Sequence, residues 1–212
     1  MGKSTKTVMN INIKTFNEWA KIGKDKSMAE NHKSSVDKMF EIIDKKKIVK
    51  NQPFKFLDLG CGNGWVIRKA MEYENCTHGV GIDGAKNMIS IAKSYNIGTF
   101  HKKNIEDYSF KNKFDIILSM ETLYYLKNID KLLENIYLNG LNESGLLIIG
   151  IDHYKENIPS LNWGNDYNLD INTLSINQWK TKFMNCNFNN VKLIQHNKKN
   201  DWEGTLIIHA EK

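Results

Sequence analysis

The segment from Phe56 to Trp65, which reads Phe-Leu-Asp-Leu-Gly-Cys-Gly-Asn-Gly-Trp, most restricts what this chain can fold into. An apolar run leads into three glycines at alternate positions, Gly60, Gly62 and Gly64, and then into a helical pattern. Glycines allow a tight turn and a close approach of the backbone to a ligand, and the helix that follows begins with free N–H groups. The segment therefore predicts a buried strand, a glycine loop and a helix that together bind a nucleotide-like cofactor.

The spacing of the glycines argues against a dinucleotide site. The dinucleotide fingerprint G-x-G-x-x-G has its third glycine where the helix packs on the strand. Counted from Gly60, that position is Trp65, and the third glycine falls one residue earlier, at Gly64. The loop is therefore a poor NAD site.

An acidic residue follows the glycine loop at the end of a second apolar run, Val80 to Asp83, nineteen residues after Gly64. A carboxylate there can accept hydrogen bonds from both hydroxyls of a ribose. The alternative interpretation of Asp83 is a simple N-cap for the helical pattern that starts near Gly84 and includes Met88.

The run Asp58-Leu59-Gly60-Cys61-Gly62-Asn63-Gly64 resembles motif I of the class I S-adenosylmethionine (SAM) dependent methyltransferases. In that family the glycine loop lies against the amino-acid part of SAM. The resemblance covers roughly residues 54–212. It implies an α/β fold, Rossmann-like and doubly wound, with a seven-stranded, mostly parallel sheet and a C-terminal antiparallel hairpin. It also implies SAM as cofactor and S-adenosylhomocysteine as product.

Short apolar runs alternate with helical patterns along the chain, as expected for a parallel sheet with crossover helices. Ser175-Ile176-Asn177-Gln178 has the form of a capping box. Residues 1–52 should form an N-terminal helical cap and residues 53–212 the SAM-binding core of a single domain, 1–212. We expect strands near 54–59, 78–82, 98–101, 114–119, 145–151, 190–196 and 203–210, and helices near 64–74, 85–95, 129–139 and 174–185.

Two further segments resemble cofactor-binding positions of the family. Asn104, Ile105 and Glu106 follow the third strand, where the family places an acid or amide beside adenine; an ordinary polar turn is the alternative. Ser119 and Met120 end the fourth strand, which resembles motif IV at the methionine end of SAM. Four further residues complete the predicted cofactor site, namely Cys61, Trp65, Tyr124 and, from the cap, Trp19.

The motif IV segment reads Ser-Met-Glu-Thr and lacks the Asn/Asp-Pro-Pro-Tyr/Phe pattern. Methyltransferases that act on the amino groups of nucleic-acid bases or on glutamine amides typically carry that pattern, so the resemblance implies a small-molecule acceptor. Residues 152–157 and Trp163 are predicted to form a polar pocket wall with one aromatic side. The residues predicted to take a proton from the acceptor are Glu121, His153, Tyr154 and His32; a thiolate or carboxylate acceptor would need none of them.

The net charge of +6 raises nucleic acid as a partner, but the basic residues favour a solvated surface. Arg68 is the only arginine, and the 29 lysines are spread along the chain. An RNA methyltransferase and a non-catalytic SAM-binding protein remain the alternatives to a small-molecule methyltransferase.

The cysteines, the apolar stretches and the first residues of the chain indicate where the protein is located and whether it binds a metal. Cys61, Cys76 and Cys186 have neither disulfide nor zinc-ligand spacing, and no other cluster predicts a metal site. No stretch is apolar enough to cross a bilayer, and the polar residues 1–6 lack the apolar core of a signal peptide. We therefore expect a cytoplasmic protein without a membrane partner; the sequence predicts no oligomeric state.

Overall fold

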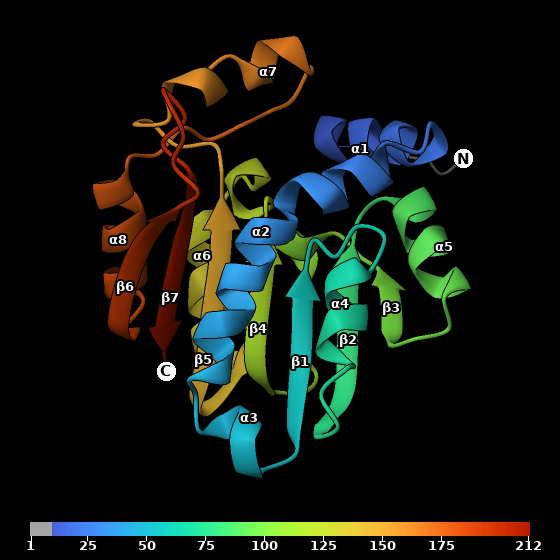
Figure 1. Ribbon diagram of the computed structural model, residues 1–212, viewed down its shortest axis with the longest axis vertical. Coiled ribbons are helices and arrows are strands. Elements are labelled where there is room, and N and C mark those ends of the chain that lie inside the picture. Colours follow the sequence, from blue (N-terminus) through green and yellow to red (C-terminus); the bar gives the residue numbers. More distant parts are fainter. Residues whose placement is uncertain (1–9) are drawn as a thin grey trace, which may run out of the picture.

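The computed structural model describes residues 10–212, which form one seven-stranded sheet with helices on both faces (Figure 1). The strand order is β3-β2-β1-β4-β5-β7-β6. Neighbouring strands from β3 to β5 are parallel, whereas β7 runs antiparallel to both β5 and β6. The α/β fold and the C-terminal antiparallel hairpin predicted from the sequence are confirmed.

The seven strands lie close to the predicted ranges. Their bounds are β1 Phe54–Leu59, β2 Cys76–Asp83, β3 Thr99–Lys102, β4 Phe114–Met120, β5 Leu141–Ile151, β6 Asn189–His196 and β7 Thr205–Glu211.

The described part of the chain contains eight α-helices and four further helical turns, and three of the α-helices precede β1. The α-helices are α1 Ile11–Lys21, α2 Lys24–Asp44, α3 Ile48–Asn51, α4 Trp65–Ala70, α5 Lys86–Ser94, α6 Ile129–Asn135, α7 Trp163–Asp166 and α8 Ile176–Asn185. The turns are η1 Ile105–Asp107, η2 Leu123–Tyr125, η3 Ile136–Gly140 and η4 Ile158–Ser160.

Three predicted boundaries differ from the structure by four residues. The helix predicted at 64–74 ends at Ala70, because the N–H groups of Glu72 and Tyr73 bond three residues back instead of four. The helix predicted at 129–139 changes to a π-helical turn after Asn135. Strand β5 begins four residues before the predicted 145, because Leu141 already pairs with Phe114 ahead of an irregularity in the register.

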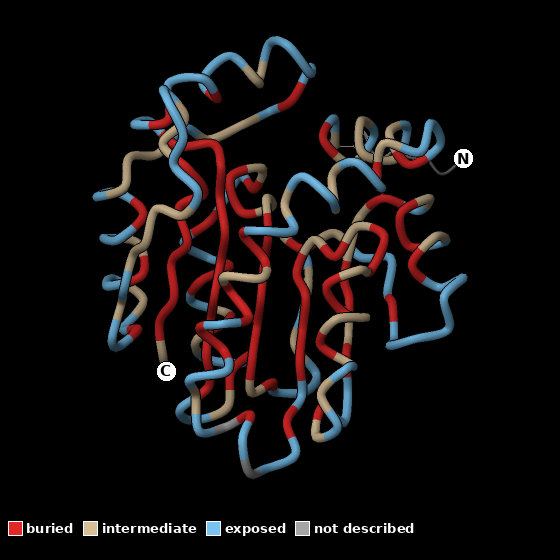
Figure 2. The backbone as a smooth tube through the Cα atoms, viewed as in Figure 1, coloured by how far each residue is buried: buried red, intermediate tan, exposed pale blue. Residues whose placement is uncertain are grey.

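The strands β1, β4 and β7 are buried along most of their length (Figure 2), and successive residues of a strand face opposite sides of the sheet. Phe54 and Phe56 of β1 pack with residues of α2, α4 and α5. Leu57 and Leu59 point to the opposite face, where they join residues of α6 and α8. Helices therefore cover both faces of the sheet and exclude water from them, which explains why the sequences of the central strands are nearly continuous apolar runs.

The predicted N-terminal cap divides into two parts. Val36, Met39, Phe40 and Ile43 recur at helical spacing in α2 and are buried against the sheet, so this half of α2 belongs to the core. Only α1 and the start of α2 lie over the carboxyl ends of the strands (Figure 1). We call this second part, residues 10–32, the lid.

The first nine residues of the predicted cap, including the start that we expect to lack a signal peptide, lie outside the described residues. Within residues 10–212, no helix combines the length and the apolar character needed to cross a bilayer.

Replacing Ser175 by alanine should lower the free energy of unfolding by about 1 kcal/mol. The capping box at the start of α8 is formed in both directions: Ser175 Oγ accepts from Gln178 N, and Gln178 Oε1 accepts from Ser175 N. Urea unfolding measures the change. Thr181→Ala on the same helix removes only a bond to the Asn177 carbonyl and should stay within about 0.5 kcal/mol of wild type; equal effects of the two changes would contradict the capping role.

Candidate active site

The glycine loop turns sharply between β1 and α4. Gly60, Gly62 and Gly64 all have positive φ angles, +82°, +50° and +77°. The amides of Gly60 and Cys61 both donate to the Ile82 carbonyl, at 2.8 and 3.0 Å, which fixes the loop across the end of β2. A Cβ on Gly60 would lie 1.9 Å from Thr122 Oγ1, so only glycine fits where the loop meets the end of β4.

Asp83 ends β2 beside this loop and supports it. Its Oδ2 accepts from Gly62 N at 3.0 Å and its Oδ1 accepts from Ala85 N at 2.7 Å. Ala85, not Asp83, is the N-cap residue of α5, so the simple capping alternative is wrong. Burial raises the pKa of Asp83, and burial together with the charge of Asp83 raises that of the neighbouring Asp58 well above its usual range.

The lid is joined to the loop and to α5 by hydrogen bonds between polar side chains and backbone. Asn63 Nδ2 in the loop donates to Asp25 Oδ2 of α2 at 2.9 Å, and both side chains are buried. Asn17 of α1 accepts from the Asn87 amide at 2.9 Å. A Cβ on Gly84 would lie 2.6 Å from Ile13 Cδ1, so α1 packs directly on the turn after Asp83.

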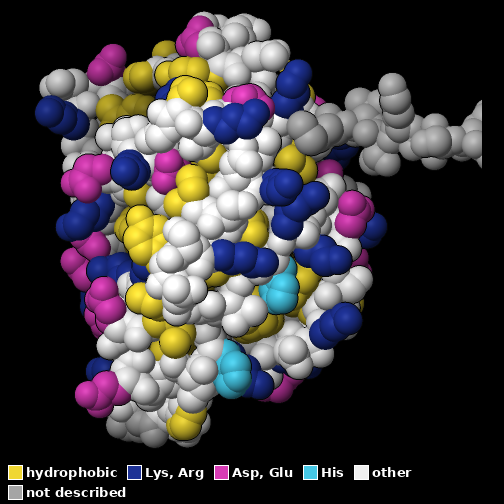
Figure 3. Space-filling model, turned by 90° about the vertical axis from the view of Figure 1, so that its right-hand side faces the viewer, with side chains coloured by type: hydrophobic (Ala, Val, Ile, Leu, Met, Phe, Trp, Pro, Cys, Tyr) yellow, Lys and Arg dark blue, Asp and Glu magenta, His cyan; other side chains and the backbone are white. Residues whose placement is uncertain are grey.

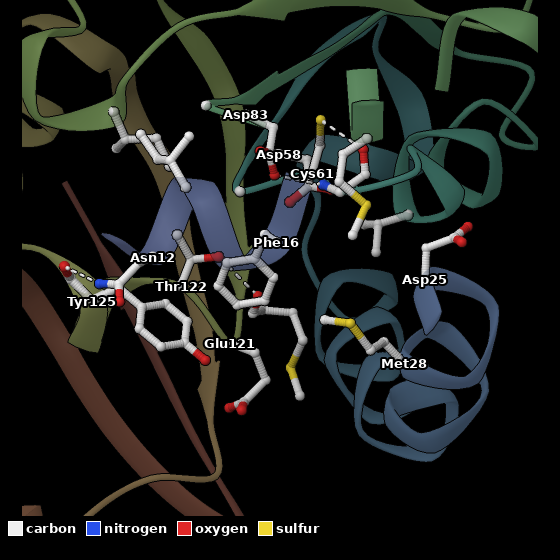
Figure 4. Close-up of a pocket in the computed structure, with 18 of the residues that line it drawn as sticks. Asn12, Phe16, Asp25, Met28, Asp58, Cys61, Asp83, Glu121, Thr122 and Tyr125 are labelled. Carbon is white, nitrogen blue, oxygen red and sulfur yellow. Dashed lines mark hydrogen bonds between the residues drawn. The ribbon is translucent and has the colours of Figure 1, made fainter. Parts of the chain in front are cut away.

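A cavity lies between the lid and the carboxyl ends of β1, β2 and β4 (Figure 4). In that view Asp58 and Asp83 lie together on one side and Glu121 on the other. The lining residues are Asn10, Asn12, Ile13, Phe16, Asp25, Met28, Ala29, His32, Asp58, Gly60, Cys61, Gly62, Trp65, Val66, Asp83, Gly84, Met88, Asn104, Ile105, Met120, Glu121, Thr122, Tyr125 and Leu126.

Most residues predicted to bind the cofactor line this cavity. They are Asp58, Gly60, Cys61, Gly62, Trp65, Asp83, Gly84, Met88, Asn104, Ile105 and Met120. Six others do not, namely Asn63, Gly64, Glu106, Ser119, Tyr124 and Trp19.

The six residues outside the lining have other partners. Ser119 Oγ donates to the Leu59 carbonyl at 2.6 Å, linking β4 to β1, and Glu106 accepts from Lys127 N. Trp19 packs edge-on against Phe16 and Tyr167. Asn63 bonds to the lid, and an added Cβ on Gly64 would meet Phe100. Tyr124 is fully buried, and its hydroxyl donates to Glu121.

The predicted proton acceptors separate into two pairs. His32 and Glu121 line the cavity. His153 and Tyr154 do not: His153 is held by the Ser160 carbonyl and Thr173 Oγ1, and the Tyr154 hydroxyl donates to the carbonyls of Glu203 and Gly204. Both are almost completely buried, so we drop them from the site.

His32, Glu121 and Asp152 form a compact cluster beside the cavity, with one ligating atom of each within 4.8 Å of the others. Asp152 Oδ2 lies 3.4 Å from His32 Nδ1, and Asp152 N donates to Glu121 Oε1 at 2.5 Å. Burial alone would lower the pKa of His32, but the bond to Asp152 and the charges of Glu121 and Asp152 raise it overall. Burial and the charge of Asp152 raise the pKa of Glu121 to about 8.

The sequence predicted His32 and Glu121 as site residues and Trp19 and His32 as contributions of the cap, but not the grouping of His32 and Glu121 with Asp152. His32 lies on α2, Glu121 follows β4 and Asp152 follows β5, so the three residues have no regular spacing along the chain that would mark them as ligands. Of the predicted polar wall, residues 152–157, only Asp152 belongs to the cluster. Trp163 of that wall instead stacks on Trp202. Asn12 of α1 also lines the cavity, and its side-chain amide donates to the carbonyls of Tyr125 and Asp170. No sequence pattern around Asn12 indicated this role.

Raising the pH from 5.5 to 8.5 should destabilise the wild-type protein relative to Glu121→Gln, by on the order of 1–3 kcal/mol. Between the unfolded value of 4.5 and the folded pKa of about 8, the native state holds a proton on Glu121 that the unfolded state has lost. Stability from this group therefore falls as the pH rises through that interval. Urea unfolding of both proteins across the range measures the difference; parallel pH curves would contradict the raised pKa.

Asp25→Ala should weaken cofactor binding and lower the unfolding free energy by about 1–3 kcal/mol, because it leaves the buried amide of Asn63 without its partner. Thermal melting and calorimetric titration with S-adenosylhomocysteine measure the two effects. Glu30→Ala, an exposed acid on the same helix, is the matched control. Equal melting temperatures and affinities for the two variants would exclude the role of Asp25.

The strand order, the glycine loop and the acid that ends β2 define the architecture of a class I SAM-dependent methyltransferase. Residues 50–202 match the sequence profile of a family described as methyltransferase domain, and the chain belongs to that family. The resemblance inferred from motif I is thereby confirmed, and SAM is the cofactor of the class.

Curated relatives match between 46% and 66% of this chain. A malonyl-[acyl-carrier protein] O-methyltransferase of Bacillus cereus is 30% identical over 109 residues, which are 50% of this chain and 40% of the relative. A ubiquinone biosynthesis O-methyltransferase of Pelagibacter ubique is 36% identical over 112 residues, 46% of this chain and 41% of the relative. The chain thus matches less than half the length of these two proteins.

Solved structures share the fold over a larger part of the chain. The complex of the Haloferax volcanii Trm112 methyltransferase activator with a candidate methyltransferase matches with a TM-score of 0.78 at 21% identity, covering 97% of this chain and 99% of that one. A SAM-dependent methyltransferase from Mesorhizobium loti matches with a TM-score of 0.65 at 15% identity, covering 76% and 92%. At these identities the likeness establishes the fold alone.

Proposed function

We propose that this chain transfers a methyl group from SAM to a small-molecule acceptor by direct in-line displacement. The observation that carries the proposal is the cavity, which joins the glycine loop and Asp83 at one side to Glu121 and His32 at the other under one lid. The sulfonium of SAM already activates its methyl group. The protein therefore needs chiefly to hold sulfur, methyl carbon and acceptor in line, which can supply several kcal/mol of the barrier.

The cofactor has a place for each of its parts in this cavity. Asp83 would accept from the ribose hydroxyls, and Asn104 with Ile105 would meet the adenine. The backbone of Gly60 to Gly62 would follow the amino-acid part, with the buried carboxylate of Asp58 facing its ammonium group. The methyl group would then point toward Met120 and Glu121, at the end of β4.

The lid favours a small acceptor. Phe16, Met28 and His32 line the cavity from above the strand ends, so an acceptor must fit between these side chains and the cofactor. A nucleotide within RNA would have to leave its strand to reach the same place. On the face shown in Figure 3, lysine and arginine side chains are interspersed with acidic and uncharged ones and do not form the continuous basic stripe that would bind an RNA strand.

Transfer of a deuterated methyl group from labelled SAM into a cell extract tests the proposal. The extract is separated by filtration into small-molecule and macromolecular fractions, and both are read by mass spectrometry. We expect label among the small molecules. Label confined to RNA or protein would overturn the small-molecule acceptor, and no label in either fraction would favour a non-catalytic SAM-binding protein. A boiled sample of the protein serves as the control for transfer by enzymes of the extract.

A further inference from the structure

The charged side chains that line the cavity are almost all acidic. Within residues 10–212 they are four carboxylates and one histidine, and neither lysine nor arginine is among the lining residues. The whole chain, in contrast, carries a net charge of +6. A concave site lined by one sign of charge concentrates ligands of the opposite sign and repels those of the same sign. The cavity therefore favours a cationic ligand.

Three of the four carboxylates belong to the loop or to the proposed cofactor site. Asp25 binds Asn63, Asp83 supports the glycine loop and faces the proposed ribose site, and Asp58 lies beside Asp83 (Figure 4). Glu121 is the fourth carboxylate, and it lies apart from Asp58 and Asp83. In its ionised form Glu121 supplies negative charge at the side of the cavity where the proposed acceptor would be bound, and a bound cation stabilises that form.

The surroundings of Glu121 include two further ionisable groups. His32 lines the same side of the cavity, and Asp152, which is not among the lining residues, has a ligating atom within 4.8 Å of those of His32 and Glu121. Asp152 Oδ1 is buried and has no hydrogen-bond partner among the described residues. A buried carboxylate oxygen without a partner is costly, and a positive charge bound beside Glu121 would offset part of that cost.

We propose, on the basis of the proposed methyl transfer, that the acceptor is a small amine, which Glu121 and His32 bind through its nitrogen. With Glu121 ionised, the protonated amine gives one proton to the Glu121 carboxylate and becomes nucleophilic. Its nitrogen then attacks the methyl carbon; the N–C bond forms as the C–S bond breaks, and sulfur keeps the electron pair. The products are a protonated N-methyl amine and S-adenosylhomocysteine, and the first proton leaves to solvent.

Glu121 and the groups that donate to it are arranged so that its carboxylate can accept a proton from the amine. A carboxylate whose pKa is near 8 is a stronger base than an ordinary glutamate. The Tyr124 hydroxyl and the Asp152 amide, which donate to its two oxygens, fix its orientation. An acceptor carboxylate would meet four acidic side chains with neither lysine nor arginine among the lining residues and only His32 to balance them, so the acceptor chemistry should differ from that of a carboxyl methyltransferase.

The chemical form of the labelled product tests the inference. The small-molecule filtrate of an extract is incubated with the purified full chain and deuterated SAM, and the products are separated on cation and anion exchangers. Label in a species whose mass differs from that of unreacted SAM, which is itself a cation, should be retained on the cation exchanger. It should survive mild alkali, which hydrolyses methyl esters but leaves N-methyl groups intact. Label in esters, ethers or thioethers would overturn the amine acceptor and leave the proposed function intact. No label in the filtrate would overturn both.

A variant of Glu121 provides an independent test. Glu121→Gln should bind S-adenosylhomocysteine within about threefold of wild type but label the amine fraction at least about 100-fold more slowly. Glu121→Asp, which keeps the charge, should be intermediate. Glu143→Gln makes the same chemical change at an exposed side chain and should match wild type. Undiminished labelling by Glu121→Gln would overturn the inference.

His32, Glu121 and Asp152 are also residue types that bind divalent cations, so a metal ion is the alternative occupant of this cluster. We expect neither MnCl₂ nor ZnCl₂ alone to raise the melting temperature, and EDTA to leave the labelling rate unchanged. Labelling that requires added metal, together with a melting-temperature shift that Asp152→Asn abolishes, would overturn the amine site in favour of a metal centre.

Discussion

Replacing Asp83 by alanine is expected to weaken the binding of S-adenosylhomocysteine more than tenfold, which corresponds to more than about 1.4 kcal/mol. The side chain lines the cavity and its two oxygens accept from the Gly62 and Ala85 amides. The substitution therefore removes the charged acceptor for the ribose and also the support of the glycine loop. Calorimetric titration measures the loss of affinity.

Two companion variants separate the parts of this effect. Asp83→Asn keeps a carbonyl oxygen that can still accept from the loop but removes the charge, so most of the loss should remain. Asp201→Ala removes an exposed acid in the β6–β7 connection and should bind like wild type. An Asp83→Ala protein that folds and binds S-adenosylhomocysteine with unchanged affinity would rule out Asp83 as the ribose partner.

The second large effect is expected at Gly60, where alanine should lower the melting temperature by roughly 6 °C or more. The φ angle of +82° is unfavourable for any residue with a Cβ, and the new methyl group would lie 1.9 Å from Thr122 Oγ1. Left-handed backbone costs about 1–2 kcal/mol and overpacking about 1–3 kcal/mol more, and each kcal/mol corresponds to about 2–4 °C in a domain of this size. Differential scanning calorimetry measures the shift.

Gly62 provides a matched control on the same loop. Its φ angle is also positive, at +50°, but an added Cβ meets no atom within 4 Å. Gly62→Ala should therefore melt within a few degrees of wild type while losing affinity for S-adenosylhomocysteine, because the open space beside it is the cavity. If Gly60→Ala melted like Gly62→Ala, or if Thr122→Gly failed to restore part of the stability of Gly60→Ala, the contact with Thr122 would not be what requires glycine.

The sequence predicted correctly those strands and helices whose apolar residues show both the length of the element and its periodicity. The run from Phe54 to Leu59 is bounded by Pro53 and Gly60, and β1 has those limits. The cap was harder to interpret, because its apolar residues serve two purposes. Met39 and Phe40 lie in the core against the sheet, whereas Phe16 and Met28 line the cavity, and all four occur in helical patterns with polar neighbours.

The prediction of site residues was most accurate for residues whose motif requires a particular backbone conformation. It was least accurate for residues that were chosen only because they lie near the end of a strand. Gly60, Gly62 and Asp83 are restricted by backbone geometry, and they line the cavity. Ser119 and His153 lie at the ends of strands, as predicted, but their side chains turn toward the interior of the protein. A strand has two faces, so the end of a strand does not determine which of its side chains reaches a ligand.

The lid and the acidic cluster depend on contacts between distant parts of the chain. His32 and Asp152 come within 3.4 Å only because α2 crosses the carboxyl ends of β4 and β5. A single sequence carries no signal for such a pair, since neither residue has a neighbour in the chain that marks it as a ligand or a base. The structure is therefore the source of the inference about the acceptor.

A crystal structure of the full chain with S-adenosylhomocysteine would test the central claim, that this cavity holds the cofactor with its sulfur toward the acceptor side. We expect the ribose hydroxyls within hydrogen-bond distance of Asp83, and the sulfur on the side of the cavity formed by Met120, Glu121 and His32. A nucleoside bound in the reverse direction, with adenine beside Glu121, or bound outside the cavity, would contradict the account.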